Sequence, residues 1–322
     1  MLRDRDSRLP VWRSQVDRDA PLRIRDDALD ILLADEATRV LAVRRGSALS
    51  QGMSLALVPL SELPEGAIQS ADAVVYLGRS LDEGAPEPVG TPVIAVAVSE
   101  PVAQKLETPG RTWINLRALG GDASKRDTEL LSQAFAVINW HASHGFSPRT
   151  GAATVPVSAG WVRKGIDPEH EIFPRIDPSV IVAVLDADDR ILLGSNAMWE
   201  ANRFSLLAGF VEPGESLEAA VEREILEESG IFVTDAHYLG SQSWPMPASL
   251  MLGFSARVDP ERESLLRPDG EEILELRWFS REELRDSLDT ILLPGRASIA
   301  RSILEWWFGE PIPEGQATGI PR

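Results

Sequence analysis

The stretch from Gly209 to Ile231, GFVEPGESLEAAVEREILEESGI, concentrates carboxylates on a segment with helical periodicity. Residues three and four apart share one helix face, so Glu224, Glu227 and Glu228 are predicted to project together. Clustered carboxylates repel one another, and the repulsion grows when they are partly buried. Hard divalent cations take oxygen ligands and are often shared between carboxylates and phosphate groups. The segment therefore predicts a metal platform for phosphate chemistry, whereas its composition alone favours the alternative of a solvated acidic helix face.

The residues around these glutamates are suited to position them. Leu217, Ala220, Val221 and Ile225 can line the opposite, buried side of the predicted helix. Gly214 allows a turn before the helix, and Gly230 can end it in a left-handed conformation. Arg223 can pair with a loop glutamate, for which Glu215 is the natural candidate, and so hold the loop against the helix.

The spacing of these residues resembles the Nudix box. A glycine, five residues, a glutamate, seven residues and then Arg-Glu-aliphatic-x-Glu-Glu-x-Gly-aliphatic run from Gly209 to Ile231. The resemblance implies hydrolysis of a nucleoside diphosphate linked to another group, with water as nucleophile and several Mg²⁺ or Mn²⁺ ions. It implies that Glu224, Glu227 and Glu228 bind metal and act in catalysis with Arg223, one glutamate also orienting or deprotonating the water. The backbone carbonyl of Ala208 is a further metal-ligand position in the family.

A second motif lies downstream, in SQSWPMPASLM. It resembles the SQPWPFPxS signature of the NADH pyrophosphatase (NudC-type) subfamily, from which it departs at two positions, where serine replaces proline and methionine replaces phenylalanine. The resemblance implies that this loop binds substrate through Gln242, Ser243, Trp244, Pro245, Met246, Pro247, Ala248 and Ser249.

Other positions match the subfamily more loosely. Phe173 and Phe210 are candidates to sandwich a nicotinamide ring, although either alone is more often a core residue. Glu272 matches a distal glutamate that contacts metal or substrate, with the neighbouring Glu271 as the alternative. Ala300 matches a substrate-contacting alanine.

Members of this subfamily commonly carry two CxxC pairs that bind structural zinc, but this chain has no cysteine. His141, His144 and His170 lie near the corresponding segment. A histidine-based zinc site is chemically possible, yet it lacks an obvious fourth ligand, so the sequence favours a metal-free, packed module.

Composition limits the possible partners and compartment. The 322 residues carry a net charge of −18, which argues against an extended nucleic-acid surface. The chain contains no run of about 18 apolar residues that could form a membrane span. The absence of cysteine suits a reducing compartment. We therefore expect a cytoplasmic protein without a membrane partner.

The predicted fold is α+β. Residues 1–140 form a small N-terminal α/β, Nudix-like domain with about 30 weakly ordered residues at its start. Residues 141–177 form a short middle module, residues 178–310 the catalytic Nudix domain, a mixed β-sheet between helices in an α/β/α sandwich, and residues 311–322 a tail. Before the predicted helix 127–141, the run ILLADEATRVLAV is predicted to be β-like.

Together these features predict metal-dependent hydrolysis of NAD(H) to NMN(H) and AMP, and removal of NAD caps from RNA 5′ ends to leave a 5′-monophosphate. Family resemblance also implies a homodimer, in which Phe173 acts in trans. One alternative is a broader hydrolase of ADP-ribose or dinucleoside polyphosphates. Another is a Nudix-fold regulator that binds nucleotide without cleaving it, which the retained box glutamates disfavour.

Overall fold

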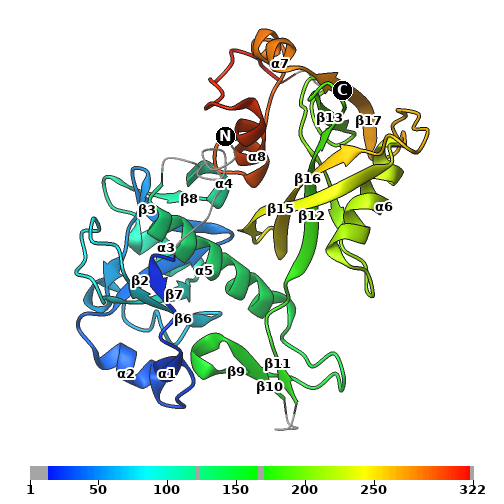
Figure 1. The fold of residues 1–322 in the computed structure, drawn as a ribbon. Helices are drawn as coiled ribbons and strands as arrows, with labels where there is room; N and C mark the ends of the chain where they lie inside the picture. Colours follow the sequence, from blue (N-terminus) through cyan, green and yellow to red (C-terminus); the bar gives the residue numbers. More distant parts are fainter. Residues whose placement is uncertain (1–13, 120–122, 166–169, 320–322) are drawn as a thin grey trace. The chain divides into compact units, whose positions relative to one another are not determined.

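The structure, a computed structural model, describes residues 14–119, 123–165 and 170–319 (Figure 1). The chain forms two compact units. Of the described residues, those between 14 and 175 together with Pro245–Ala248 form the N-terminal unit, and Ile176–Trp244 together with those between 249 and 319 form the C-terminal unit. Within the described residues, no helix is long and apolar enough to cross a membrane.

The described elements of the N-terminal unit mix strands and helices. They are β1 (Val16–Asp17), α1 (Ala20–Arg23), α2 (Ala28–Ala34), β2 (Arg39–Arg44), β3 (Ser47–Gln51), β4 (Ser54–Leu55), β5 (Val58–Pro59), the 3-10 helix η2 (Leu60–Glu62), β6 (Val74–Ser80), β7 (Pro92–Ala97), α3 (Glu100–Leu106), β8 (Arg111–Ile114), α4 (Leu116–Leu119), α5 (Lys125–Ser143), β9 (Val155–Val157), the 3-10 helix η4 (Ser158–Gly160), β10 (Val162–Lys164) and β11 (Glu171–Ile172). Some regular structure thus begins before residue 30, while residues 1–13 lie outside the described part.

The run ILLADEATRVLAV differs from its β-like prediction, which is wrong for its first residues. Ile31 to Ala34 belong to α2, and the strand β2 starts only at Arg39. Ala28 and Leu32, one helical turn apart, are both buried on one face of α2. Packing of this face decided between two conformations that the short apolar run allowed.

The main sheet of the N-terminal unit has the order β1-β6-β7-β2-β3-β4, with β5 paired to β2 and β8 paired to β3. Strand β2 runs parallel to β7 and antiparallel to β3. Helix α5 begins at the cap Ser124, whose side chain accepts the Asp127 N–H, and buries one side against the sheet. The predicted helix 127–141 is therefore confirmed, with two extra residues at each end.

The three-stranded sheet β11-β10-β9 is joined to α5 through a buried arginine. Arg163 donates hydrogen bonds to Thr154 Oγ1 (2.7 Å), to the Thr154 carbonyl (2.8 Å) and to His141 Nδ1 (2.8 Å). Because arginine can only donate, His141 is neutral and its Nε2–H donates to the Gly160 carbonyl (2.7 Å). Burial lowers the pKa of His141. Both ring nitrogens of His141 are thus engaged in hydrogen bonds rather than available to zinc.

The C-terminal unit is built on a mixed sheet of order β15-β16-β12-β13-β17, with β14 paired to β12. Its elements are β12 (Asp177–Leu185), β13 (Ile191–Asn196), β14 (Leu207–Phe210), α6 (Leu217–Ser229), β15 (Val233–Trp244), β16 (Ser249–Val258), β17 (Ile273–Phe279), α7 (Arg281–Ser287) and α8 (Ile299–Phe308). Strand β12 is parallel to β16 over its whole length and antiparallel to β14.

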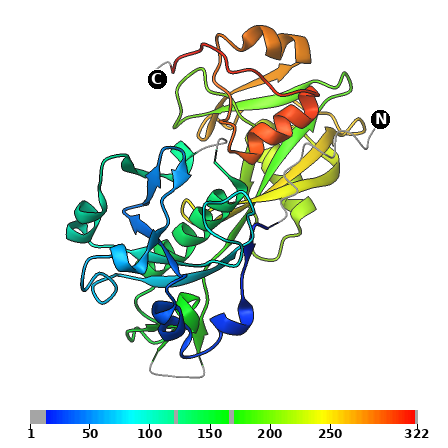
Figure 2. The same cartoon turned by 90° about the vertical axis from the view of Figure 1, so that its left-hand side faces the viewer.

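Alternation along β12 divides the core of this unit in two. Val180, Val182 and Val184 pack on the side of α6, and Ile181 and Ala183 pack on the side of α8. Figure 1 shows α6 beside the sheet, and the turned view in Figure 2 shows the orange-red α8 against the green and yellow strands. The predicted α/β/α sandwich is confirmed.

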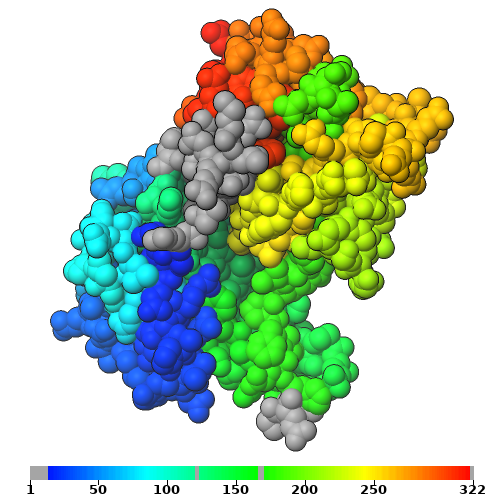
Figure 3. Space-filling model, viewed as in Figure 1, coloured from blue at the N-terminus to red at the C-terminus, as the bar shows by residue number. Residues whose placement is uncertain are grey.

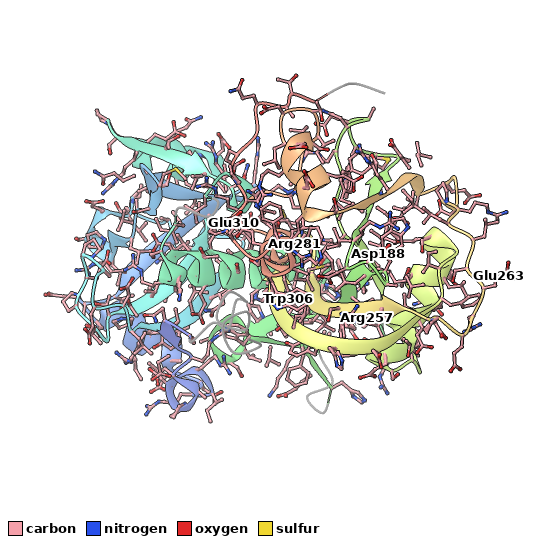
Figure 4. All side chains as sticks on the ribbon, turned by 45° about the horizontal axis from the view of Figure 1, so that its top comes forward. Asp188, Arg257, Glu263, Arg281, Trp306 and Glu310 are labelled. Carbon is pink, nitrogen blue, oxygen red and sulfur yellow. The ribbon has the colours of Figure 1, made fainter. Side chains whose placement is uncertain are left out.

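Helices α7 and α8 are tied together near the end of the unit. Arg281, labelled in Figure 4 near Trp306, donates to the Trp307 carbonyl (3.0 Å) and to Asp189 (2.8 Å), and its guanidinium lies 4.7 Å from the Trp307 ring centre. These contacts fix the helix layer on the face of the sheet opposite to α6.

We expect Arg163→Ala to lower the free energy of unfolding by about 2–4 kcal/mol, because it leaves the buried His141 and Thr154 groups without their donor. The matched control is Lys164→Ala, which removes only the exposed ion pair with Glu171 and should change stability by less than about 1 kcal/mol. Denaturant unfolding followed by circular dichroism measures both. Equal losses in the two variants, or unfolding of the wild type by a zinc chelator, would contradict this account of the module.

Candidate active site

Helix α6 starts and ends at the signals that its sequence contains. The side chain of Ser216 caps the helix by accepting the Ala219 N–H (3.1 Å). At the other end Gly230 has φ 70°, and its N–H donates to the Leu226 carbonyl (2.9 Å). Ala220, Val221 and Ile225 are fully buried against the sheet, so the helix is held by its apolar side.

Gly209, within strand β14, leaves room for the carboxylate of the first box glutamate. A Cβ atom at Gly209 would overlap the carboxylate of Glu224. The Glu224 side chain therefore lies directly on the β14 backbone, and burial raises its pKa. The Glu224 carboxylate can occupy this position only while residue 209 has no side chain.

Arg223 holds the loop before α6 in place, as the sequence predicts. Its guanidinium makes a two-pronged contact with the Glu215 carboxylate, whose second oxygen also accepts the Glu212 N–H (3.0 Å). Another N–H of Arg223 donates to the Phe210 carbonyl (2.9 Å). Hydrogen bonding to Arg223 lowers the pKa of Glu215 to about 2, so this pair stays charged.

Arg223 also partly neutralises the box. Its Nη1 atom lies 2.9 Å from Glu224 Oε1 and 3.0 Å from Glu227 Oε2. The Glu227 side chain remains 60% exposed, and the yellow-green segment that contains α6 forms part of the surface in Figure 3. Glu227 thus faces solvent while Glu224 is drawn inward.

Glu228 is the most deeply buried of the carboxylates Glu224, Glu227, Glu228 and Glu272. The residue is only 5% exposed, and its Oε2 atom is buried without a hydrogen-bond partner. Burial, followed by the charges of Glu272, Glu224 and Asp269, raises the pKa of Glu228 to about 8. The N–H of Ala208 opposes this shift. An ionised, buried carboxylate in this setting requires a positive partner.

Glu272 and Asp269 enter from the turn before β17. One carboxylate oxygen of Asp269 accepts three successive backbone N–H groups, those of Glu271 (2.8 Å), Glu272 (3.0 Å) and Ile273 (2.9 Å). Glu272, not Glu271, contributes charge repulsion to Glu224 and Glu228. Asp269 was missed from the sequence, where the Asp-Gly pair before the glutamates was its only signal.

The donor set suits a hard divalent cation. Among the described residues, no group of three or more His, Asp or Glu side chains is already arranged to hold a metal ion; Arg223 contacts Glu224 and Glu227 instead. The unpartnered oxygen of buried Glu228 and the repulsion among Glu224, Glu228 and Glu272 nevertheless supply the negative potential that such a cation would neutralise. Oxygen-only donors fit Mg²⁺ or Mn²⁺ better than zinc.

The SQSWPMPAS segment forms the end of β15, a turn with a cis Met246–Pro247 peptide, and the start of β16. Gln242 uses its side-chain amide to hold the chain before α8: Nε2 donates to the Ala297 carbonyl (2.6 Å), and Oε1 accepts the Ile299 N–H (2.7 Å). Pro245–Ala248 group with the N-terminal unit. Gln242 therefore has a structural role beside any role in binding substrate.

The remaining predicted residues have contrasting surroundings. Phe173, in the N-terminal unit, is 62% exposed, and Phe210, in the C-terminal unit, is 56% exposed. Ala300, at the start of α8, is buried in the core. The binding of a nicotinamide ring between the two phenylalanines stays a prediction.

Comparison with known proteins gives the class of this chain first. The NUDIX domain family matches residues 175–307, and the NADH pyrophosphatase-like rudimentary NUDIX domain family matches residues 37–140. The C-terminal unit is thus the Nudix hydrolase domain, and the box lies on its helix α6. Enzymes of this class use divalent metal ions.

Full-length relatives then define the family. The chain is 43% identical over 288 residues, 86% of its length and 85% of the relative's, to the NAD-capped RNA hydrolase NudC of Mycobacterium tuberculosis. It is 35% identical to the human NAD-capped RNA hydrolase NUDT12, over 57% of this chain and 42% of that protein. Among solved structures, a NUDIX hydrolase from Nitrosomonas europaea aligns with a TM-score of 0.37 at 23% identity, over 53% of this chain and 97% of that one. The protein belongs to the NudC family of Nudix hydrolases.

We expect Gly209→Ala to lower turnover by about 100-fold or more, because a methyl group displaces the Glu224 carboxylate while the rest of the sheet stays intact. Gly295→Ala is the matched control, since a Cβ there meets open space. Steady-state kinetics together with circular dichroism separate loss of activity from loss of fold. Normal turnover in Gly209→Ala would show that this close contact is dispensable.

The raised pKa of Glu228 predicts a pH-dependent stability in chelator. Unfolded glutamate loses its proton near pH 4.5, whereas the folded site keeps it to about pH 8, so stability falls as pH rises between these values. Glu228→Gln should remove a cost of roughly 2–4 kcal/mol above pH 8 and melt at a higher temperature than the wild type there. The difference should shrink towards pH 5. Thermal melting from pH 5 to 9 tests this, and parallel curves would refute it.

Proposed function

We propose that this protein hydrolyses the pyrophosphate bond of NAD(H), giving NMN(H) and AMP, and that it removes NAD caps from RNA 5′ ends to leave a 5′-monophosphate. The observation that carries the proposal is the buried Glu228 carboxylate, one oxygen of which has no hydrogen-bond partner, together with its charge repulsion from Glu224 and Glu272. The names of the relatives, both NAD-capped RNA hydrolases, support the same substrate class.

We assign the cation-binding role to Glu224, Glu227, Glu228 and Glu272, with the Ala208 carbonyl as a backbone ligand. Bound Mg²⁺ or Mn²⁺ ions supply charge neutralisation on the pyrophosphate and a more acidic water. Arg223 contributes by fixing the box loop through Glu215 and by orienting Glu224 and Glu227. One of the box glutamates orients or deprotonates the attacking water.

Substrate recognition is assigned to the SQSWPMPAS loop and to the exposed aromatics. We propose that Trp244 and the residues from Ser243 to Ser249 contact the dinucleotide, with Gln242 setting the loop's position from its contacts with residues 297–299. Phe210 follows Gly209 directly and is exposed, so it is available to stack on a nicotinamide ring. Phe173 fills the second stacking role in the proposed homodimer, and Ala300 supports the pocket from within the core.

Capped RNA would enter by its end rather than along a groove. Only the ribose on the AMP side of NAD continues into RNA, so one pocket serves both substrates. The net charge of −18 disfavours contacts with a long phosphate backbone. The proposal therefore requires an unpaired, accessible 5′ end, and it fits a cytoplasmic protein.

We expect purified protein incubated with NADH and Mg²⁺ or Mn²⁺ to yield reduced NMN and AMP, and no product in excess chelator, as measured by liquid chromatography. Glu228→Gln should lower turnover by about 100-fold or more while retaining the fold, because it removes charge where the cations bind. The matched control is Glu218→Gln, on the first turn of the same helix.

The same assay separates the two substrate classes. Cleavage of ADP-ribose or diadenosine polyphosphates in place of NADH would replace this proposal with the broader hydrolase, for which Ser243 and Met246 are the altered positions. Wild-type turnover in Glu228→Gln would remove the proposed site altogether.

A further inference from the structure

Strand β17 approaches the carboxylate cluster through an irregularity in its pairing with β13. Ser195 lies opposite Glu275, whereas the next residue, Asn196, lies opposite Ile273, so Leu274 is the extra residue of a β-bulge. Bulges bend a strand and redirect the side chains next to them. Here the bulge brings Glu272, just before β17, alongside the end of β13.

Asn196 contacts Glu272 at that point. The Ala197 N–H donates to the Glu272 carbonyl (2.7 Å), and Asn196 Nδ2 donates to Glu272 Oε1 (3.1 Å). The other end of the Asn196 amide accepts the Met198 N–H (2.8 Å). Because a backbone N–H can only donate, the amide oxygen must face Met198 and the amide NH₂ group must face Glu272. The orientation of Asn196 is thus determined by its own loop.

Glu272 is consequently held on two sides. Asp269 fixes its backbone through the three N–H groups that it accepts, and Asn196 fixes one carboxylate oxygen. Glu272 is exposed to solvent, so without these two contacts its side chain would sample several rotamers. Its charge acts on both Glu224 and Glu228.

We propose that Asn196 is a positioning residue that orients Glu272 as a cation ligand of the Nudix site. The inference rests on the proposed function in that Glu272 belongs to the cation site. Asn196 touches neither the box glutamates nor the reacting bond in this account; it acts through Glu272 alone. Residues that orient a metal ligand commonly change metal affinity by about 10- to 100-fold when removed.

The test measures Mn²⁺ binding directly, by the electron paramagnetic resonance signal of free Mn²⁺ in titrations of the full chain. Asn196→Ala is expected to weaken Mn²⁺ binding about tenfold. Asn196→Ser, which keeps an oxygen able to accept the Met198 N–H but is too short to reach Glu272, should lose as much and so separates loop folding from the contact. The matched control is Glu200→Gln, which breaks the ion pair with Arg203 in the same loop and should bind Mn²⁺ as the wild type does.

A double-mutant cycle decides whether Asn196 acts through Glu272. Asn196→Ala combined with Glu272→Gln should bind no more weakly than Glu272→Gln alone. Wild-type Mn²⁺ binding in Asn196→Ala, or additive losses in the double variant, would overturn the inference. If Asn196→Ala weakens Mn²⁺ binding through Glu272 but no NADH is cleaved by the wild type, the inference stands and the proposed function fails.

Discussion

The repulsion among partly buried carboxylates is the constraint on which the active site of this protein depends. Glu224 lies on the backbone of Gly209, and Glu228 is almost fully buried with an oxygen that no hydrogen bond satisfies. Folding alone gains nothing from this arrangement, because burial disfavours the charged form of each group. The rest of the unit compensates: the apolar side of α6 packs on the sheet, and the Arg223–Glu215 pair anchors the loop. Stability is thus given up locally where function requires negative charge.

The two units have similar strand arrangements in their sheets, but only the C-terminal unit has the helix α6 that carries the box glutamates. In the C-terminal unit the strand order is β15-β16-β12-β13-β17, and β14 pairs with β12. In the N-terminal unit the corresponding order is β6-β7-β2-β3, with β5 paired to β2 and β8 paired to β3. Both contain one central parallel pair, β12 with β16 and β2 with β7. Between β5 and β6, however, residues 60–73 contain only the short helix η2, where the C-terminal unit has α6. This comparison explains the match of residues 37–140 to a rudimentary NUDIX domain: the N-terminal unit has the sheet but lacks a helix corresponding to α6.

The small module after α5 is held together by hydrogen bonds from a buried arginine. Arg163 joins Thr154, just before β9, to His141 on α5. One arginine with several fixed donors can connect elements that otherwise share little apolar surface. The hydrogen-bond network and the packing of Trp161, whose indole N–H donates to the Tyr76 carbonyl (2.7 Å), together account for the order of this small sheet.

The sequence by itself determined the family, the acidic helix with its terminal glycine, the Arg223–Glu215 contact and the mixed sheet between helices of the C-terminal unit. These features depend on neighbours in the chain, on helical or strand periodicity, or on a long, specific motif. Tertiary structure decided which end of ILLADEATRVLAV is helical, how deeply Glu228 is buried, that Asp269 and Asn196 hold Glu272, and that Gln242 is bound to the chain before α8. Apart from the contact of Asp269 with Glu272, which lies three residues away, each of these depends on packing between residues far apart in sequence, and local sequence does not encode that packing.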